Sequence, residues 1–129
     1  MSGRYLLDTS VIIELFATDQ AVRQQVGIAE GVFVPAVAIG ELYYGAYKSA
    51  RTQENVAQIE RFAALNVILP CDAETARWYG MVKDQLRKKG HPLPENDIWI
   101  AALALQHNLT IATRDLHFGA VESAQVAFW

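Results

Sequence analysis

The chain has 129 residues, of which 52% are hydrophobic and 19% charged, so we expect one compact domain over residues 1–129 with a substantial core. This composition excludes a disordered segment, and no stretch is long and apolar enough to span a bilayer. The net charge of −3 argues against a sequence-independent nucleic-acid coat, although it does not exclude a nuclease.

The N-terminal residues Met1 to Arg4 lead directly into a short strand-like segment. A signal peptide needs a longer apolar region and a cleavage site, so we expect a cytoplasmic protein. The single cysteine, Cys71, rules out an internal disulfide, and we expect it to pack at a strand end.

Short apolar segments alternate along the chain with helical patterns. Four to five strands are predicted, at residues 4–7, 32–34, 67–69, 109–112 and, as the fifth, 125–128. Helices are predicted at residues 11–16, 19–30, 36–49, 52–65, 73–89 and 94–107. This alternation indicates an α/β protein whose parallel sheet is covered on both faces. The helix over 36–49 is apolar almost all round and is therefore expected to be buried, with Tyr44 and Tyr47 in core or subunit packing.

Four carboxylates lie in otherwise apolar sequence: Asp8, Glu41, Asp97 and Asp115. A carboxylate in such surroundings is costly unless it is paired, protonated or bound to a cation, and few basic residues are close by in sequence. Oxygen ligands suit Mg²⁺ and Mn²⁺, which activate water and neutralise charge on a phosphodiester. The four acids therefore indicate a divalent metal site that acts on a phosphate.

Each acid also has a simpler interpretation. Asp8 and Asp115 each follow a predicted strand and could cap what comes next, and Glu41 could extend to solvent. Asp97 sits in a first helical turn, where compensation of the helix dipole is about as good an explanation as a site role. Strand topology alone brings only Asp8 and Asp115 to the same edge of the sheet.

Polar residues flank the acids and could orient carboxylates or metal-bound water: Thr9, Ser10, Asn96 and Thr113. For Ser10, helix capping is the favoured role. Arg114 could contact a substrate phosphate or pair with Asp115, and the two roles have equal weight.

The remaining ionisable residues give weaker signals. The three histidines match no zinc motif, and only His117, two residues after Asp115, is kept as a remote candidate near the site. Basic residues are concentrated in one segment and could offer a phosphate backbone a local positive surface: Arg77, Lys83, Arg87, Lys88 and Lys89.

Four segments together resemble one known family. Residues 6–13, 41–45, 90–102 and 113–118 are similar, in the expected order, to the acidic motifs of PIN-domain ribonucleases, especially the VapC-type toxins of bacterial toxin–antitoxin pairs. The segment 90–102 is the most specific of them. Two positions depart from the family pattern, because His117 stands where Asp is frequent and Leu103 where His is frequent in close relatives.

The resemblance implies an α/β/α sandwich and a Mg²⁺- or Mn²⁺-dependent endoribonuclease, usually dimeric. Asp8, Glu41 and Asp97 would be the main acidic residues, with Asp115 as the fourth. It also implies a cognate antitoxin whose C-terminal segment blocks the active site. Attack by metal-activated water would leave 5′-phosphate and 3′-hydroxyl ends. The alternative is a non-catalytic PIN-fold module that binds a protein partner, and the four intact acids argue against it.

Overall fold

The structure, a computed structural model, describes residues 3–129. In chain order its elements are β1 (Arg4–Leu7), α1 (Thr9–Phe16), α2 (Gln20–Ile28), β2 (Gly31–Pro35), α3 (Ala36–Tyr47), α4 (Thr52–Leu65), β3 (Val67–Leu69), α5 (Ala73–Lys89), α6 (Glu95–His107), β4 (Thr110–Thr113), the 3-10 helix η1 (Leu116–Ala120) and β5 (Val126–Phe128).

The strands form a five-stranded sheet in the order β3-β2-β1-β4-β5, and every adjacent pair is parallel. The predicted α/β class and parallel sheet are confirmed, including the fifth strand at the C-terminal end of the chain. β1 is central, because the chain first builds outward through β2 and β3 and then crosses back to add β4 on the other side. In open parallel sheets, ligands bind outside the carboxyl ends of the strands at such a reversal.

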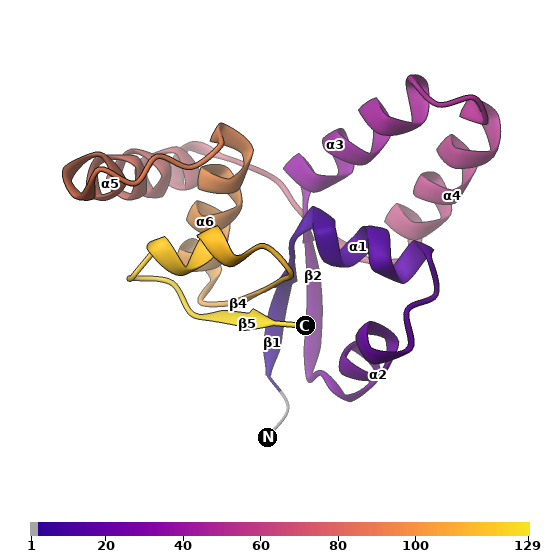
Figure 1. Ribbon diagram of the computed structural model, residues 1–129, viewed down its shortest axis with the longest axis horizontal. Coiled ribbons are helices and arrows are strands. Elements are labelled where there is room, and N and C mark those ends of the chain that lie inside the picture. Colours follow the sequence, from indigo (N-terminus) through magenta and orange to yellow (C-terminus); the bar gives the residue numbers. More distant parts are fainter. Residues whose placement is uncertain (1–2) are drawn as a thin grey trace.

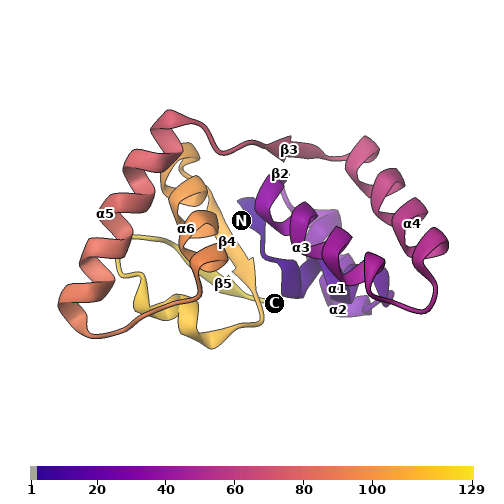
Figure 2. The ribbon, with the colours of Figure 1, turned by 90° about the horizontal axis from the view of Figure 1, so that it is seen from above.

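Helices cover both faces of the sheet, which is the sandwich that the resemblance implied. Figures 1 and 2 show α5 and α6 on one side and α1 to α4 on the other. Successive strand residues divide between the two cores, as a pleated strand requires. Leu6 and Ile111 pack with α5, α6 and η1, whereas Leu7 and Ala112 pack with the helices of the other face.

Local sequence signals explain where α5 and α6 begin and end. The Asp72 side chain accepts a hydrogen bond from the Thr75 amide at 3.0 Å in a reciprocal capping box, and Gly90 ends α5 in the left-handed conformation, with φ at +70°. α6 begins at Glu95, with Pro94 as its N-cap residue. It therefore starts one residue later than the predicted helix.

The burial of α3 is less complete than its composition suggested. Leu42 and Ala46 lie in the core, but Tyr44 and Tyr47 are 68% and 65% exposed. The core role predicted for these two tyrosines is therefore wrong, because most of each side chain is open to solvent. A role in subunit packing stays a prediction. Cys71 is exposed just after β3.

Among residues 3–129 there is no helix with both the length and the apolar character needed to cross a membrane.

Candidate active site

The candidate site lies at the carboxyl ends of β1 and β4, where the strand order reverses. Asp8 directly follows β1, and its amide donates to the Ala112 carbonyl at 2.9 Å, which extends the pairing of β1 with β4 by one residue. Asp115 lies two residues beyond β4. The predicted convergence of these two acids at one edge of the sheet is confirmed by the topology.

The Asp8 carboxylate is held by the hydroxyl groups of two neighbouring residues. Asp8 is only 5% exposed, and its Oδ2 accepts hydrogen bonds from the Ser10 and Thr113 hydroxyls, each at 2.8 Å. Asp8 occupies the N-cap position of α1, but its side chain makes no capping hydrogen bond. The simple capping interpretation therefore does not explain this buried carboxylate.

Thr113 connects two of the acids. It is fully buried at the end of β4, and its hydroxyl donates to Asp8 and accepts from the Asp115 amide at 2.9 Å. The capping role expected for Ser10 is wrong, because Asp8 occupies the N-cap position of α1 and the Ser10 hydroxyl instead donates to Asp8 and accepts from the Arg114 amide at 3.2 Å. Its position two residues after Asp8 is the only sequence signal for that contact.

Asp97 reaches this edge from the first turn of α6. Its side chain is 15% exposed. Burial raises the pKa of the Asp97 carboxyl above its usual value, the charges of Asp8 and Asp115 act in the same direction, and His117 opposes them. The negative charges of Asp8 and Asp115 thus repel that of Asp97, and the three residues lie at the ends of different elements.

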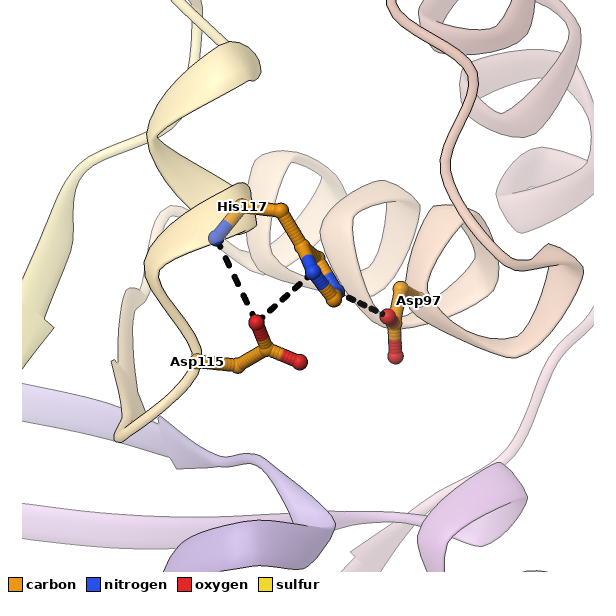
Figure 3. A group of neighbouring side chains, drawn as sticks. All are labelled: Asp97, Asp115 and His117. Atoms are coloured by element: carbon orange, nitrogen blue, oxygen red, sulfur yellow. Dashed lines mark hydrogen bonds and ion pairs between the residues drawn. The ribbon is translucent and has the colours of Figure 1, made fainter.

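His117 lies between two of these acids. Figure 3 shows its ring between the carboxylates of Asp97 and Asp115. Nε2 is 2.8 Å from Asp97 Oδ2, and Nδ1 is 2.7 Å from Asp115 Oδ1. Asp115 also caps η1, because its Oδ1 accepts from the His117 amide at 3.3 Å. The capping role expected for Asp115 and its place beside the other acids therefore coexist.

Glu41 approaches the site from α3. Its Oε1 accepts a hydrogen bond from the Thr9 hydroxyl at 2.8 Å. Glu41 and Asn96 both line a surface hollow of about 510 Å³, together with Tyr44, Cys71 and Trp99. Within the described residues, the compact group whose ligand atoms all lie within 4.8 Å of one another contains Asp97, Asp115 and His117, and neither Asp8 nor Glu41.

Arg114 points to a different set of partners. Its guanidinium pairs with Glu14 at 3.6 Å and Asp19 at 3.1 Å, and its Nε donates to the Trp129 carbonyl at 2.9 Å. These contacts attach the end of the chain to the region between α1 and α2. The pairing with Asp115 that the sequence suggested is not among them.

We refer to Asp8, Glu41, Asp97 and Asp115 as the acidic edge. In the described part of the chain, no lysine or arginine lies within ion-pairing distance of any of the four, and His117 is their one basic partner. Carboxylate oxygens with neighbouring hydroxyl donors are the surroundings that Mg²⁺ and Mn²⁺ prefer. The residues present therefore fit a divalent cation.

This combination of fold and acidic edge is found in a known class of proteins, and the sequence matches the PIN domain profile over residues 5–123. The chain belongs to the PIN domain family. It is 33% identical to the ribonuclease VapC2 of Haemophilus influenzae, over 88% of this chain and 87% of that protein. It is 32% identical to a tRNA(fMet)-specific endonuclease VapC of Shigella flexneri, over 87% of this chain and 86% of the relative.

A solved structure gives the same likeness in three dimensions. VapBC-5 of Mycobacterium tuberculosis, described as a member of the VapBC family of toxin–antitoxin systems, superposes with a TM-score of 0.80 at 29% identity. The alignment covers 98% of this chain and 99% of the other. The PIN fold implied by the sequence motifs is thereby confirmed.

Proposed function

We propose that the protein is a metal-dependent endoribonuclease that acts in the cytoplasm as the toxin of a toxin–antitoxin pair. One observation carries the proposal. Asp97 is largely buried beside Asp8 and Asp115, with a raised pKa and without a lysine or arginine partner. A bound cation would favour the charged form of this carboxylate, and it would equip the edge for phosphodiester hydrolysis.

The named relatives support the reaction and the biological role. VapC2 of Haemophilus influenzae is a ribonuclease, and the relative from Shigella flexneri is an endonuclease specific for tRNA(fMet). We extend to this chain the reaction class, RNA cleavage, and leave the identity of the RNA to experiment. By the likeness to VapBC-5, a member of a family of toxin–antitoxin systems, one partner would be an antitoxin. The motif resemblance adds a second copy of the chain.

The acidic edge would hold Mg²⁺ or Mn²⁺ through carboxylate oxygens of Asp8, Glu41, Asp97 and Asp115. When bound, the cation would supply an activated water and neutralise charge on the phosphodiester. Hydroxyl donors of Thr9 and Thr113 orient Glu41 and Asp8 respectively.

Asn96 and Arg114 complete the proposed set of residues. Asn96, exposed beside Asp97 at the rim of the 510 Å³ hollow, would orient metal-bound water. Arg114 would contact the RNA backbone, with its side chain 36% exposed at the same end of β4.

A non-catalytic interaction module with a PIN fold is the alternative. Partly buried carboxylates that repel one another contribute nothing to such a module. Substitution of one of these acids would relieve the repulsion without weakening the binding of a partner. The intact acidic edge favours the enzyme.

The test uses purified protein without an affinity tag, incubated with total RNA in Mg²⁺, in Mn²⁺ and in EDTA. We expect cleavage that needs the divalent ion and leaves 5′-phosphate and 3′-hydroxyl ends, mapped by ligation-based sequencing. Asp97→Asn is the matched negative control. Full cleavage in EDTA or by the Asp97→Asn protein would overturn the proposed function.

A further inference from the structure

We propose that His117 is itself a ligand of the cation, through Nε2, and that Asp115 acts chiefly by holding the His117 ring. This inference rests on the metal site of the proposed function. It concerns a residue of this chain that departs from the pattern of the acidic motifs, and it replaces the direct cation contact proposed above for Asp115 with a positioning role.

The first argument is the spacing of ligand atoms. Nε2 of His117 lies 2.8 Å from Oδ2 of Asp97. Two neighbouring ligands on an octahedral ion with bonds of about 2.1 Å are roughly 3 Å apart. A cation could therefore bind both atoms, in place of the hydrogen that they share, with little movement of either side chain.

The second argument is the way Asp115 engages the histidine. Its Oδ1 is 2.7 Å from Nδ1 and also accepts from the His117 backbone amide at 3.3 Å. One carboxylate oxygen thus fixes both the position of the residue and the direction of its ring. A hydrogen bond from Nδ1 to a carboxylate directs the other nitrogen toward a metal, an arrangement that recurs where histidine binds metal.

The third argument is the course of the chain. Thr113 anchors the Asp115 amide at the end of β4, and η1 then starts with His117 in its first turn. The buried Phe118 fixes the next position in the core. The ring is therefore placed over Asp97 by two anchored neighbours, and not by a flexible surface loop.

A nitrogen ligand changes which cation the site prefers. Mg²⁺ binds almost entirely through oxygen, whereas imidazole suits transition metals. We therefore expect this chain to favour Mn²⁺ over Mg²⁺ more strongly than a variant with aspartate at position 117.

The competing explanation is that His117 only compensates the charge of Asp97 and Asp115. The two roles predict opposite changes in Mn²⁺ affinity when the His117 side chain is removed. If His117 is a ligand, its removal weakens Mn²⁺ binding. If it is a charge partner that competes with the cation, its removal strengthens Mn²⁺ binding.

The direct test is pulsed electron paramagnetic resonance of Mn²⁺ bound to the untagged protein. We expect nitrogen modulation that changes when histidine is labelled with ¹⁵N, which identifies a histidine ligand without any substitution. The modulation should disappear in His117→Ala and persist in His107→Ala, since His107 ends α6 at the far side from Asp97. Absence of nitrogen modulation in the wild-type protein, or its persistence in His117→Ala, would overturn the proposal.

Affinities give the second readout. We expect His117→Ala to weaken Mn²⁺ binding by at least about tenfold, measured from the free Mn²⁺ signal. His117→Asp should lower the preference for Mn²⁺ over Mg²⁺, measured by Mg²⁺ competition. Unchanged or tighter Mn²⁺ binding in His117→Ala contradicts the ligand role. RNA cleavage enters neither measurement, so a protein that binds Mn²⁺ through His117 and cleaves no RNA would refute the proposed function and leave this inference standing.

Discussion

Two charged regions of the molecule contrast sharply: the acidic edge and the outer surface of α5. On α5, Arg87 and Lys88 pair with Asp84 at 2.7 and 2.9 Å, and Arg77 pairs with Glu74 at 2.7 Å. These partners are three or four residues apart in sequence, and all are exposed except Asp84, which is half-buried. On the acidic edge the charges are partly buried and come from separate elements, and among residues 3–129 their one basic partner is His117.

The comparison bears on one expectation, a local positive surface over residues 77–89. The two remaining basic residues of this segment are paired as well, Lys83 with Glu95 and Lys89 with Glu122. Its five basic residues thus share four acidic partners, because Arg87 and Lys88 both pair with Asp84, and each of these surface contacts is worth little. The positive surface stays a prediction. Charge on the acidic edge is not balanced, and this imbalance is what makes the edge a candidate for binding a cation.

The largest effect is expected from removing one charge of the acidic edge. Asp97→Asn should lower the rate of RNA cleavage by at least about 100-fold, because the site loses a negatively charged ligand of the cation that would neutralise charge on the phosphodiester. Cleavage of a labelled RNA under single-turnover conditions measures it. Asp84→Asn on α5 is the matched control and should cleave at the wild-type rate. Equal losses in both variants would remove the distinction between the two regions.

Two fully buried threonines allow a finer comparison. Thr113→Val removes the hydroxyl that joins Asp8 to Asp115, and Thr75→Val removes one that contacts Asp72 and Gln106 between α5 and α6. Each should cost about 1–2 kcal/mol of unfolding free energy in urea titrations. Only Thr113→Val should also weaken Mn²⁺ binding, by about tenfold. A loss of Mn²⁺ affinity in Thr75→Val would show that the effect is not local.

The contribution to stability should change with pH in opposite directions for Asp97 on the acidic edge and for Asp84 on α5. The pKa of Asp97 is raised from 3.8, so the folded state binds its proton more tightly than the unfolded state. Without divalent ions, the stability contribution of this group therefore falls as the pH rises from 3.8 through the folded pKa. Asp97→Asn should lack this loss and gain stability relative to wild type at neutral pH.

Asp84 provides the opposite case. Hydrogen bonds from Arg87 and Lys88 lower its pKa, so the stability that it contributes above pH 3.8 is lost as the pH falls through the folded pKa. Urea titrations in EDTA from acidic to neutral pH compare the two variants with wild type. A difference between wild type and Asp97→Asn that does not change with pH would contradict the raised pKa.

The smallest effect is expected on α5 itself. Lys88→Gln removes one exposed ion pair, and such pairs contribute little because water and salt screen them. The melting temperature and the rate of RNA cleavage should match those of wild type. A clear fall in cleavage that grows at low salt would instead indicate that this surface contacts RNA.

Much of the fold could be predicted because its signals are local. Strand and helix positions follow from short apolar segments, caps and periodicity, and the structure places the predicted strands within one residue of their expected ends. The exposure of Tyr44 and Tyr47 could not be predicted. The composition of α3 does not reveal which of its sides is covered by other elements of the fold. The ion pairs within α5 follow from helical spacing, whereas the pairs of Lys83 with Glu95 and of Lys89 with Glu122 depend on how distant segments pack.

The sequence by itself determined the acids, their placement after strands or in a first helical turn, and the order of motifs that indicates a PIN domain. Strand topology brought Asp8 and Asp115 together, since both follow adjacent parallel strands. Only the tertiary structure decided that Asp97 contacts His117, 20 residues away, and that Thr113 links Asp8 to Asp115. The reason is physical: these contacts depend on how α6 and η1 pack over the sheet, and side-chain packing between distant elements has no signature in local sequence.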